Sequence, residues 1–398
     1  MDREKALLVY SGWLGDFVWI IPTIKALRSR FKSVSLVVSD IQGPLALGLE
    51  GTLVDKVYVG TRRNRAAVAR SVRNEAIESG IGTFIDIKGR GKAGLFIPWH
   101  RDIQIYMPDR HDAREYTLAR LLHPFATCLP PRDPASHMVD GYLGIARFFG
   151  AQKITVDFRL SFPEHVVAKA RSVEETHGLR TGRTVVLSPG SAQFSKIWPA
   201  KNYRALADTL QGDLGCKVVV MGARNFPPNG NYDMIVAQPY MGDRKFVNLI
   251  GRTDILTDSC LLQSGVFDVA VGNDSFAGHM AGSASEVAAE TPMAARAPDG
   301  RWFKANRTVS LFGPTNPVFC RPYDPTGKFN TILQPAEYPA DCKYDRTSHT
   351  CPHYGDRKCF MASHCMPAIT VEQVVKAVEW QLNAGRAAHA QAGPAVEA

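Results

Sequence analysis

The residues with the clearest chemical potential follow a predicted strand in the stretch 184–200, TVVLSPGSAQFSKIWPA. Gly190 and Ser191 lie in a small polar turn, and Lys196 adds a positive charge. In an open α/β sheet, ligands bind at the carboxyl ends of strands, where such turns lead into helices. Free backbone N–H groups and a lysine together suit a diphosphate.

A second stretch of the same kind is 266–282, VFDVAVGNDSFAGHMAG. Asp274 and Ser275 stand at a predicted helix start after a buried strand, and His279 follows about one turn later. Each turn alone can be an ordinary strand-to-helix connection, with Asp274 as a plain helix N-cap. Two such turns, about 80 residues apart, favour a shared anionic ligand.

A second carboxylate, Asp16, follows the turn SGWLG between a predicted strand at 6–10 and a predicted helix at 17–31. The turn is not GxGxxG, so it gives no support for a dinucleotide site. Asp16 can serve as a helix N-cap, or it can act as a general base at the mouth of a cleft.

Cations cluster after the predicted strand 83–89, TFIDIKG, where Lys88, Arg90 and Lys92 alternate with glycines. Several cations on a glycine-rich loop at the end of a strand can grip a carboxylate or a phosphate. The alternative is a solvated loop without a ligand.

The pattern of the remaining chain predicts an α/β fold with mostly parallel sheets and helices on both faces. In the first half we expect strands at 6–10, 33–40, 54–60 and 83–89, helices at 17–31, 65–79 and 137–149, and a loop-rich segment at 101–134. In the second half we expect strands at 184–187, 217–223, 267–271 and 308–317, helices at 201–215, 254–265 and from 275, a surface insertion at 285–307, and a helix at 370–385 that Gly385 stops.

A chain of 398 residues exceeds what one hydrophobic core usually spans, so two domains are expected, with a linker within 151–182. The net charge of +9 fits an anionic membrane leaflet or an acidic acceptor. The basic residues are mostly scattered and form no nucleic-acid motif, so we expect no nucleic-acid partner. No apolar run reaches the roughly 20 residues of a membrane span and no signal peptide is evident, so a cytoplasmic location is expected.

Four of the eight cysteines crowd into one segment with three histidines. They are Cys342, Cys351, Cys359 and Cys365. Four thiolates can bind zinc or iron tetrahedrally, but the spacing contains no CxxC pair. A structural metal site, reduced thiols and disulfides all remain open, although a cytoplasmic location disfavours disulfides.

The motifs taken together resemble glycosyltransferase family 9, the ADP-heptose:lipopolysaccharide heptosyltransferases. The resemblance rests, in chain order, on SGWLGDFVWIIPTIKALRSRF, SPGSAQFSKIWPAKNYRALAD, GNDSFAGHMAG with SLFGPTNP, and CFMASHCMPAITVEQVV. It implies a GT-B fold, in which two Rossmann-like domains face each other across a cleft, and inverting chemistry without a catalytic metal. The implied domains are an acceptor-binding domain at 1–165, a nucleotide-sugar domain at 180–340, a Cys-rich segment with the last helix at 341–385, and a disordered tail at 386–398.

The resemblance also assigns roles to the candidate residues. Asp16 matches the catalytic base, Lys196 the lysine on the donor diphosphate, and Asp274 the aspartate that binds the heptose. The further donor-binding residues are Gly190, Ser191, Ser275 and His279, and the acceptor-binding residues are Lys88, Arg90, Lys92 and His137. The chain departs from the family pattern at Phe276, where the motif has glycine, and at Arg224, where some members have a glutamate.

The expected function is therefore transfer of heptose from ADP-heptose to a lipopolysaccharide inner-core acceptor, a Kdo or a heptose, by a peripheral enzyme at the inner face of the cytoplasmic membrane. The partners would be an ADP-sugar donor, a lipid-linked acidic acceptor and the anionic inner leaflet. Alternatives are transfer of another sugar, transfer onto a protein as in autotransporter-type heptosyltransferases, or a non-catalytic sugar-nucleotide-binding protein.

Overall fold

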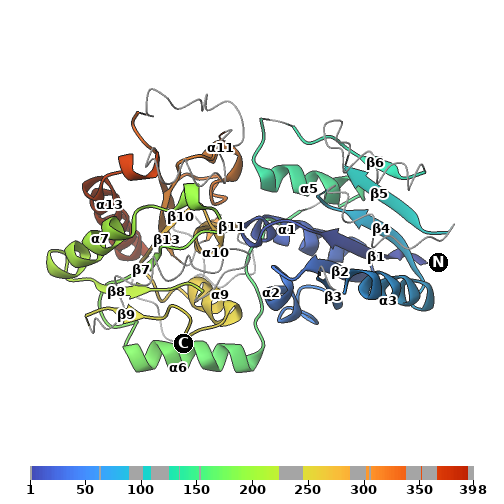
Figure 1. The fold of residues 1–398 in the computed structure, drawn as a ribbon, viewed down its shortest axis with the longest axis horizontal. Coiled ribbons are helices and arrows are strands. Elements are labelled where there is room, and N and C mark those ends of the chain that lie inside the picture. Colours follow the sequence, from blue (N-terminus) through green and yellow to red (C-terminus); the bar gives the residue numbers. More distant parts are fainter. Residues whose placement is uncertain are drawn as a thin grey trace. The chain divides into compact units, whose positions relative to one another are not determined.

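The computed structural model describes residues 2–61, 64–88, 102–108, 125–133, 135–151, 154–223, 245–286, 302–303, 306–337, 351 and 365–392. The chain divides into two compact units, Met1–Pro163 and Glu164–Ala398. Each unit has its own six-stranded sheet with helices packed against it (Figure 1).

The first unit is built on a sheet with the order β3-β2-β1-β4-β5-β6, in which every neighbouring pair of strands is parallel. Its strands are β1 (Asp2–Tyr10), β2 (Ser33–Ser39), β3 (Lys56–Gly60), β4 (Ile81–Asp86), β5 (Gln104–Pro108) and β6 (Thr127–Leu129). The central strands β1, β2 and β4 are continuous buried runs rather than alternating ones. Such runs are typical of a parallel sheet that is covered on both faces.

Helices cover both faces of this sheet. They are α1 (Leu14–Arg30), α2 (Gly43–Leu47), α3 (Arg65–Glu78) and α5 (Met138–Phe148). Successive side chains of a strand point to opposite faces. Leu7 and Val9 of β1 share a core cluster with Val72 of α3. Tyr10 points to the other face, where its ring meets Phe17 of α1 edge-on with 5.9 Å between the ring centroids.

The second unit repeats this design. Its sheet has the order β14-β13-β10-β7-β8-β9, again entirely parallel. The strands are β7 (Thr184–Ser188), β8 (Lys217–Val220), β9 (Val247–Asn248), β10 (Val269–Asn273), β13 (Arg307–Leu311) and β14 (Asn330–Leu333). Two further strands, β11 (Ser285–Glu286) and β12 (Trp302–Phe303), form a separate antiparallel pair at the ends of the expected insertion.

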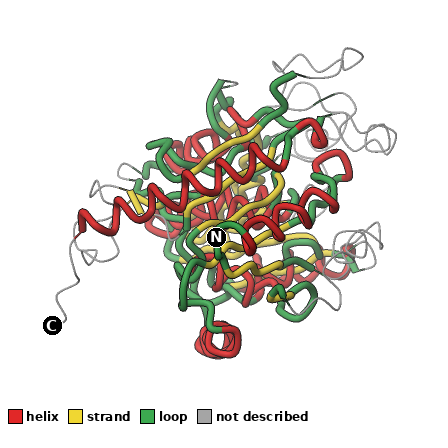
Figure 2. The backbone as a smooth tube through the Cα atoms, turned by 90° about the vertical axis from the view of Figure 1, so that its left-hand side faces the viewer, coloured by secondary structure: helices red, strands yellow, loops and turns green. Residues whose placement is uncertain are grey.

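Helices pack against the second sheet as well, and two of them share a core cluster with its strand β7. The unit contains α6 (Glu164–His177), α7 (Ala200–Gly212), α9 (Ile255–Gln263), α10 (Phe276–Gly282), α11 (Pro317–Cys320) and α13 (Val371–Ala392), with short 3-10 turns at Phe194–Lys196 and Met366–Ala368. Leu206 of α7 and Val378 of α13 share one core cluster with Val185 and Leu187 of β7. In Figure 2, α13 is the long helix that leads to the C-terminal end.

Both sheets have the same strand order when the strands are counted along each unit, 3-2-1-4-5-6. The order reverses between β1 and β4 in the first unit and between β7 and β10 in the second. At a reversal the two following loops diverge to opposite faces of the sheet, which leaves room for a ligand. The expected α/β fold with two Rossmann-like domains is confirmed.

The boundary between the two units, Pro163 to Glu164, lies within the segment 151–182 where a linker was expected, but this segment also contains the 14-residue helix α6. Several further expectations about the elements were wrong. The loop-rich segment 101–134 contains the strands β5 and β6, and β13 is followed by another strand, β14, at the sheet edge. Gly385 does not stop the last helix, because the alanine-rich sequence after it favours helix and α13 continues to Ala392. The expected disordered tail therefore begins with helix.

None of the described helices is long and apolar enough to cross a membrane.

One buried carboxyl makes the stability of the second unit depend on pH. Asp258 lies in α9, is 8% exposed, and accepts a hydrogen bond from the hydroxyl of Thr253. Burial, assisted by the nearby charge of Asp254, raises the pKa of Asp258 to about 7. The folded protein therefore holds a proton here that the unfolded chain releases near pH 4.

We expect the free energy of unfolding to fall as pH rises from about 4 to about 7, by on the order of 4 kcal/mol from this group alone. Asp258→Asn keeps an oxygen for Thr253 and carries no charge, so it should remove this dependence and stabilise the protein at pH 8. Urea unfolding of both proteins between pH 4 and pH 8 measures the difference. Parallel pH profiles for the two would contradict the assignment.

Candidate functional site

The second unit brings its two candidate loops together at the reversal between β7 and β10. The loop after β7 ends in the 3-10 turn that carries Lys196, and Asp274 follows β10 directly. Lys196 Nζ lies 2.5 Å from Asp274 Oδ2, although 78 positions separate the two residues in the sequence. The side chain of Asp274 is 2% exposed and that of Lys196 is 14% exposed. The lysine side chain is thus the more exposed member of the pair.

Asp274 is enclosed by hydrogen-bond partners rather than acting as a helix cap. Thr315 donates its hydroxyl to Oδ2 at 2.6 Å, and Nε2 of His279 lies 3.1 Å from Oδ1. Burial alone would raise the pKa of this carboxyl, but Lys196 and His279 outweigh burial and hold the pKa of Asp274 well below its usual range. The carboxylate is therefore a fixed negative charge that orients the lysine. The N-cap position of α10 belongs to Ser275.

Asn273 fastens the two loops to each other. Its Oδ1 accepts hydrogen bonds from the backbone N–H of Trp198 and the hydroxyl of Tyr203, each at 3.1 Å, and its Nδ2 donates to the carbonyl of Pro189 at 2.7 Å. The side chain is fully buried. Trp198 also donates its indole N–H to the carbonyl of Ile369 at 2.8 Å, which ties the loop to the segment before α13.

Sequence reasoning placed Asn273 in the second polar turn without giving it a role, and it missed Thr315 as a site residue. Both lie inside motifs that the sequence had already singled out, GNDS and SLFGPTNP. The signal available was position, because each follows a buried strand that neighbours another in the sheet. A polar side chain at such a strand end can reach the neighbouring loop.

The other expected donor-binding residues differ in how far they are buried. Gly190 faces open space, because a Cβ there would meet nothing within 4 Å. Ser191 is half-buried and accepts a weak hydrogen bond at 3.4 Å from the N–H of Gln193. Ser275 is half-buried, whereas His279 is 3% exposed and sits behind Asp274. His279 is therefore a buried hydrogen-bond partner of Asp274.

The first unit also places an ion pair at its strand-order reversal. Asp16 lies in the first turn of α1, after β1, and its Oδ2 accepts a hydrogen bond from the ammonium of Lys88, after β4. The N-cap of α1 is Trp13, so the side chain of Asp16 is used for Lys88 and not for capping. Gln42, fully buried, donates to the carbonyl of Gly12 and braces the loop between β1 and α1.

Two of the expected acceptor-binding residues, Arg90 and Lys92, lie outside the described residues. His137 is described, and it caps helix α5: its Nδ1 accepts the backbone N–H of Val139 at 3.1 Å. Its ring meets Trp19 of α1 edge-on, with 6.3 Å between the centroids. His137 therefore helps to fix α5 in place.

Two of the four cysteines of the expected metal site are described, and both lie at one turn. Cys351 donates its N–H to the carbonyl of Pro314 at 2.7 Å, and a Cβ on Gly313 would lie 2.7 Å from Sγ of Cys365. Both cysteines are buried. Within the described part of the chain, no cluster of three or more metal-binding side chains occurs. Cys342 and Cys359 lie outside it, so the zinc or iron site stays a prediction.

Comparison with known proteins agrees with this arrangement. Residues 125–286 match the model of glycosyltransferase family 9 (heptosyltransferase). No curated protein sequence matches the chain.

Solved structures resemble the chain over nearly its whole length. The glycosyl transferase family 9 protein from Veillonella parvula DSM 2008 is 20% identical, with a TM-score of 0.67 over 96% of this chain and 98% of its own. ADP-heptose lps heptosyltransferase II from E. coli is 17% identical, with a TM-score of 0.63 over 95% and 98%. E. coli heptosyltransferase WaaC with ADP is 15% identical, with a TM-score of 0.58 over 95% and 99%.

Two Rossmann-like units with charged loops at their strand-order reversals have the GT-B fold, and the protein is a glycosyltransferase. Within that class, residues 125–286 carry the match to glycosyltransferase family 9, the heptosyltransferase family.

Because Asn273 uses both ends of its amide, we expect Asn273→Asp to destabilise the second unit. The new carboxylate oxygen would face the carbonyl of Pro189, which costs roughly 2–4 kcal/mol of unfolding free energy. Asn248→Asp is the matched control, since the contact found for Asn248 is an Oδ1 that accepts the N–H of Ile250. Urea unfolding of both variants tests the difference, and equal midpoints would contradict the role of Asn273.

Proposed function

We propose that this glycosyltransferase transfers a heptose from ADP-heptose to a lipopolysaccharide inner-core acceptor, a Kdo or a heptose, with inversion at the anomeric carbon. The observation that carries the proposal is the pair of Lys196 and Asp274 at the strand-order reversal of the second unit. A partly exposed ammonium held by a buried carboxylate is a fixed positive charge, and a fixed positive charge suits a diphosphate. The named E. coli neighbours use ADP-heptose or bind ADP, which supports the same donor.

In this proposal Lys196 stabilises the negative charge that gathers on the leaving diphosphate. A preorganised charge of this kind needs little rearrangement as the bond to the sugar breaks. The open space beside Gly190 lets the backbone approach the phosphates closely. Asp274 already has both carboxylate oxygens engaged, so it acts first by orienting Lys196. Contact between Asp274 and a sugar hydroxyl requires one of these hydrogen bonds to be exchanged.

Asp16 is proposed as the general base. The acceptor hydroxyl attacks the anomeric carbon, its proton passes to Asp16, and the bond to the diphosphate breaks with its electron pair on the phosphate oxygen. Asp16 is suited to this because its side chain is 21% exposed and no hydrogen bond from a described residue reaches Oδ1. A positioned base contributes typically 10²–10⁴ in rate.

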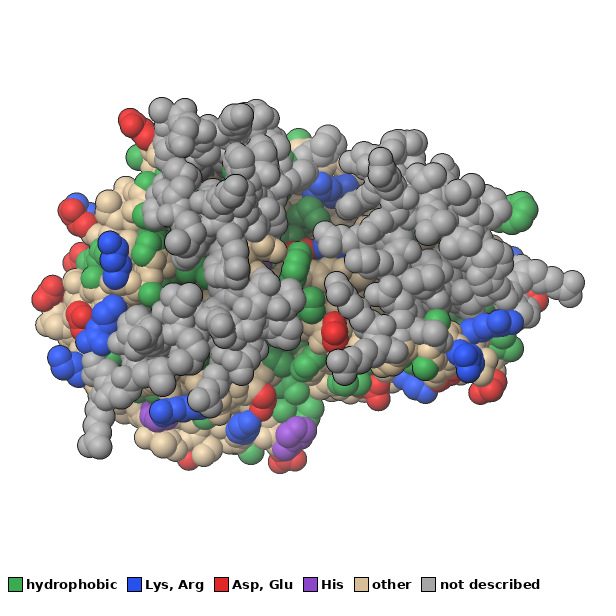
Figure 3. All heavy atoms as spheres, in the orientation of Figure 1, with side chains coloured by type: hydrophobic (Ala, Val, Ile, Leu, Met, Phe, Trp, Pro, Cys, Tyr) green, Lys and Arg blue, Asp and Glu red, His purple; other side chains and the backbone are tan. Residues whose placement is uncertain are grey.

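The charge of the protein bears on the acceptor and on the membrane. An acidic, lipid-linked acceptor and an anionic leaflet fit the net charge of +9. On the face drawn in Figure 3, Lys and Arg side chains of the described residues are interspersed with Asp and Glu. That part of the surface gives no single basic patch, so acceptor contacts are proposed for Arg90 and Lys92.

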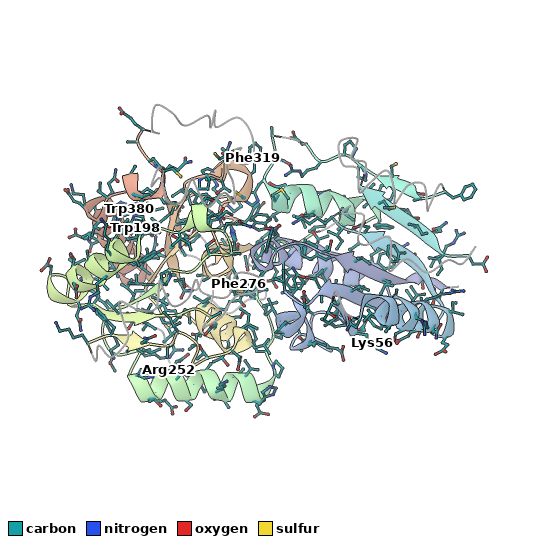
Figure 4. All side chains as sticks on the ribbon, in the orientation of Figure 1. Lys56, Trp198, Arg252, Phe276, Phe319 and Trp380 are labelled. Carbon is teal, nitrogen blue, oxygen red and sulfur yellow. The ribbon has the colours of Figure 1, made fainter. Side chains whose placement is uncertain are left out.

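Phe276 favours a second candidate, transfer from a different sugar nucleotide. It opens helix α10 directly after Ser275, is half-buried, and stands where the family motif has glycine (Figure 4). A phenyl ring in place of a hydrogen atom changes the shape of the loop end that carries Asp274. A donor with a smaller sugar, or with another nucleotide, would suit a reshaped pocket.

Donor identity is tested by thermal unfolding with ADP-heptose and with UDP-, GDP- and CMP-sugars. A ligand that binds only the folded protein increases the free energy of unfolding, by about 2.7 kcal/mol at 100 times its Kd. The melting temperature therefore rises. We expect a rise with ADP-heptose that Lys196→Ala abolishes. Lys201→Ala is the control, because Lys201 is an exposed lysine at the start of α7. A rise with another nucleotide sugar alone would replace ADP-heptose by that donor.

The base is tested by Asp16→Asn, which removes the proton acceptor and keeps the shape of the side chain. We expect kcat for transfer to fall by about 10²–10⁴. The thermal shift with donor should stay at the wild-type value, because Asp16 and the donor-binding lysine belong to different units. Asp40→Asn, at an exposed aspartate after β2, is the control. Undiminished turnover in Asp16→Asn would remove Asp16 from the mechanism.

A further inference from the structure

Lys88 was expected to meet the acceptor, yet the structure turns it inward. It follows β4 after Asp86 and is only 5% exposed. Its ammonium pairs with Asp16 and lies 5.5 Å from the centroid of the Tyr10 ring. An ammonium enclosed in this way is poorly placed to bind a bulky anionic substrate from solvent.

Neighbouring residues contact both the backbone and the ammonium of Lys88. Its backbone N–H donates to Oδ1 of Asp86 at 3.1 Å, and Asp86 is 1% exposed. Gly12 passes directly over the ammonium, since a Cβ at Gly12 would lie 2.7 Å from Nζ. Burying a lysine is costly unless its charge is paired and hydrogen-bonded, so the site stabilises this side chain through a specific partner.

The two members of the ion pair differ in what they present to solvent. The side chain of Asp16 is 21% exposed, whereas that of Lys88 is 6% exposed. The lysine takes Oδ2, and no hydrogen bond from a described residue reaches Oδ1. The buried partner therefore fixes the rotation of the carboxylate and leaves one oxygen for a proton.

We propose that Lys88 is a positioning residue for the base, holding Asp16 Oδ2 so that Oδ1 takes the proton of the acceptor hydroxyl. The inference rests on the proposed function, because it assigns Lys88 to the same proton transfer. Lys88 itself gains and loses no proton in this step. A base must lie within hydrogen-bond reach of its proton, and small misplacements of a reacting group cost large factors in rate.

The test is a double-mutant cycle on the wild type, Lys88→Met, Asp16→Asn and the double variant, with initial rates at varied donor and acceptor. We expect Lys88→Met to lower kcat by about 10-fold to 100-fold, with both KM values within about twofold of wild type. In the Asp16→Asn background the same change should alter kcat by less than about twofold, because a residue that acts through Asp16 has nothing left to position.

Lys25→Met is the matched control. Like Asp16, Lys25 lies on α1; it is half-buried and pairs with Asp157 at 2.9 Å in the same unit. Its loss should lower stability and leave kcat unchanged, which separates loss of an ion pair from loss of a positioned base. Lys88→Arg keeps the charge and should recover part of the activity that Lys88→Met loses.

If Lys88→Met fails to fold, Gly12→Ala carries the test. Its methyl group would overlap the Tyr10 hydroxyl and lie 2.7 Å from the Lys88 ammonium, so it would displace both groups and disturb the pairing with Asp16. Gly12→Ala should then lower kcat in the wild-type background and have no effect in Asp16→Asn. The positioning role would be overturned if the two substitutions of either cycle lowered kcat by factors that multiply and if the acceptor KM rose. Lys88 would then be an acceptor-binding residue. A wild type that transfers sugar from no donor would instead overturn the proposed function.

Discussion

The site depends on one constraint of parallel sheets: where the strand order reverses, the loops after two neighbouring strands diverge, and polar groups can gather there. Both units of this protein have such a reversal, between β1 and β4 and between β7 and β10. In each unit, a charged residue from one loop pairs with an opposite charge from the other. The backbone topology therefore brings together residues that are some 70 to 80 positions apart in the sequence.

The two ion pairs have their charges in opposite order along the chain. In the first unit the aspartate follows the first strand of the sheet and the lysine follows the fourth, whereas in the second unit the lysine comes first. The exposed member differs as well: Asp16 is the more exposed partner in the first pair, and Lys196 in the second. One kind of interaction thus presents a carboxylate oxygen in one unit and an ammonium in the other. The base and the diphosphate-binding ammonium that we propose would arise from the same construction.

Much of this could be predicted from the sequence, because strand ends are visible as apolar runs that stop at glycine and polar residues. That signal located Asp16, Lys196 and Asp274, and it was enough for the fold. It could not reveal burial, so Lys88 was assigned to the acceptor although its ammonium is enclosed by Asp16 and Gly12.

Short edge elements gave a weaker signal than the central strands. The strand β6 has three residues, and an apolar pattern of that length does not distinguish a strand from a loop. The helix α6 is mostly polar and starts after a proline, so its segment resembled a linker. Gly385 misled for another reason: glycine often follows the last turn of a helix, but here the alanines beyond it continue the helix.

The hydrogen bond between Trp198 and Ile369 has a consequence for how the protein is made. Trp198 ends the loop that carries Lys196, and its indole is held by a carbonyl that comes 171 residues later in the sequence. During synthesis on the ribosome, the sheet of the second unit can pair its strands before that carbonyl emerges, but the loop cannot take its final form. A chain released before Ile369 would contain every strand of the second sheet and still lack the hydrogen bond that holds the Lys196 loop.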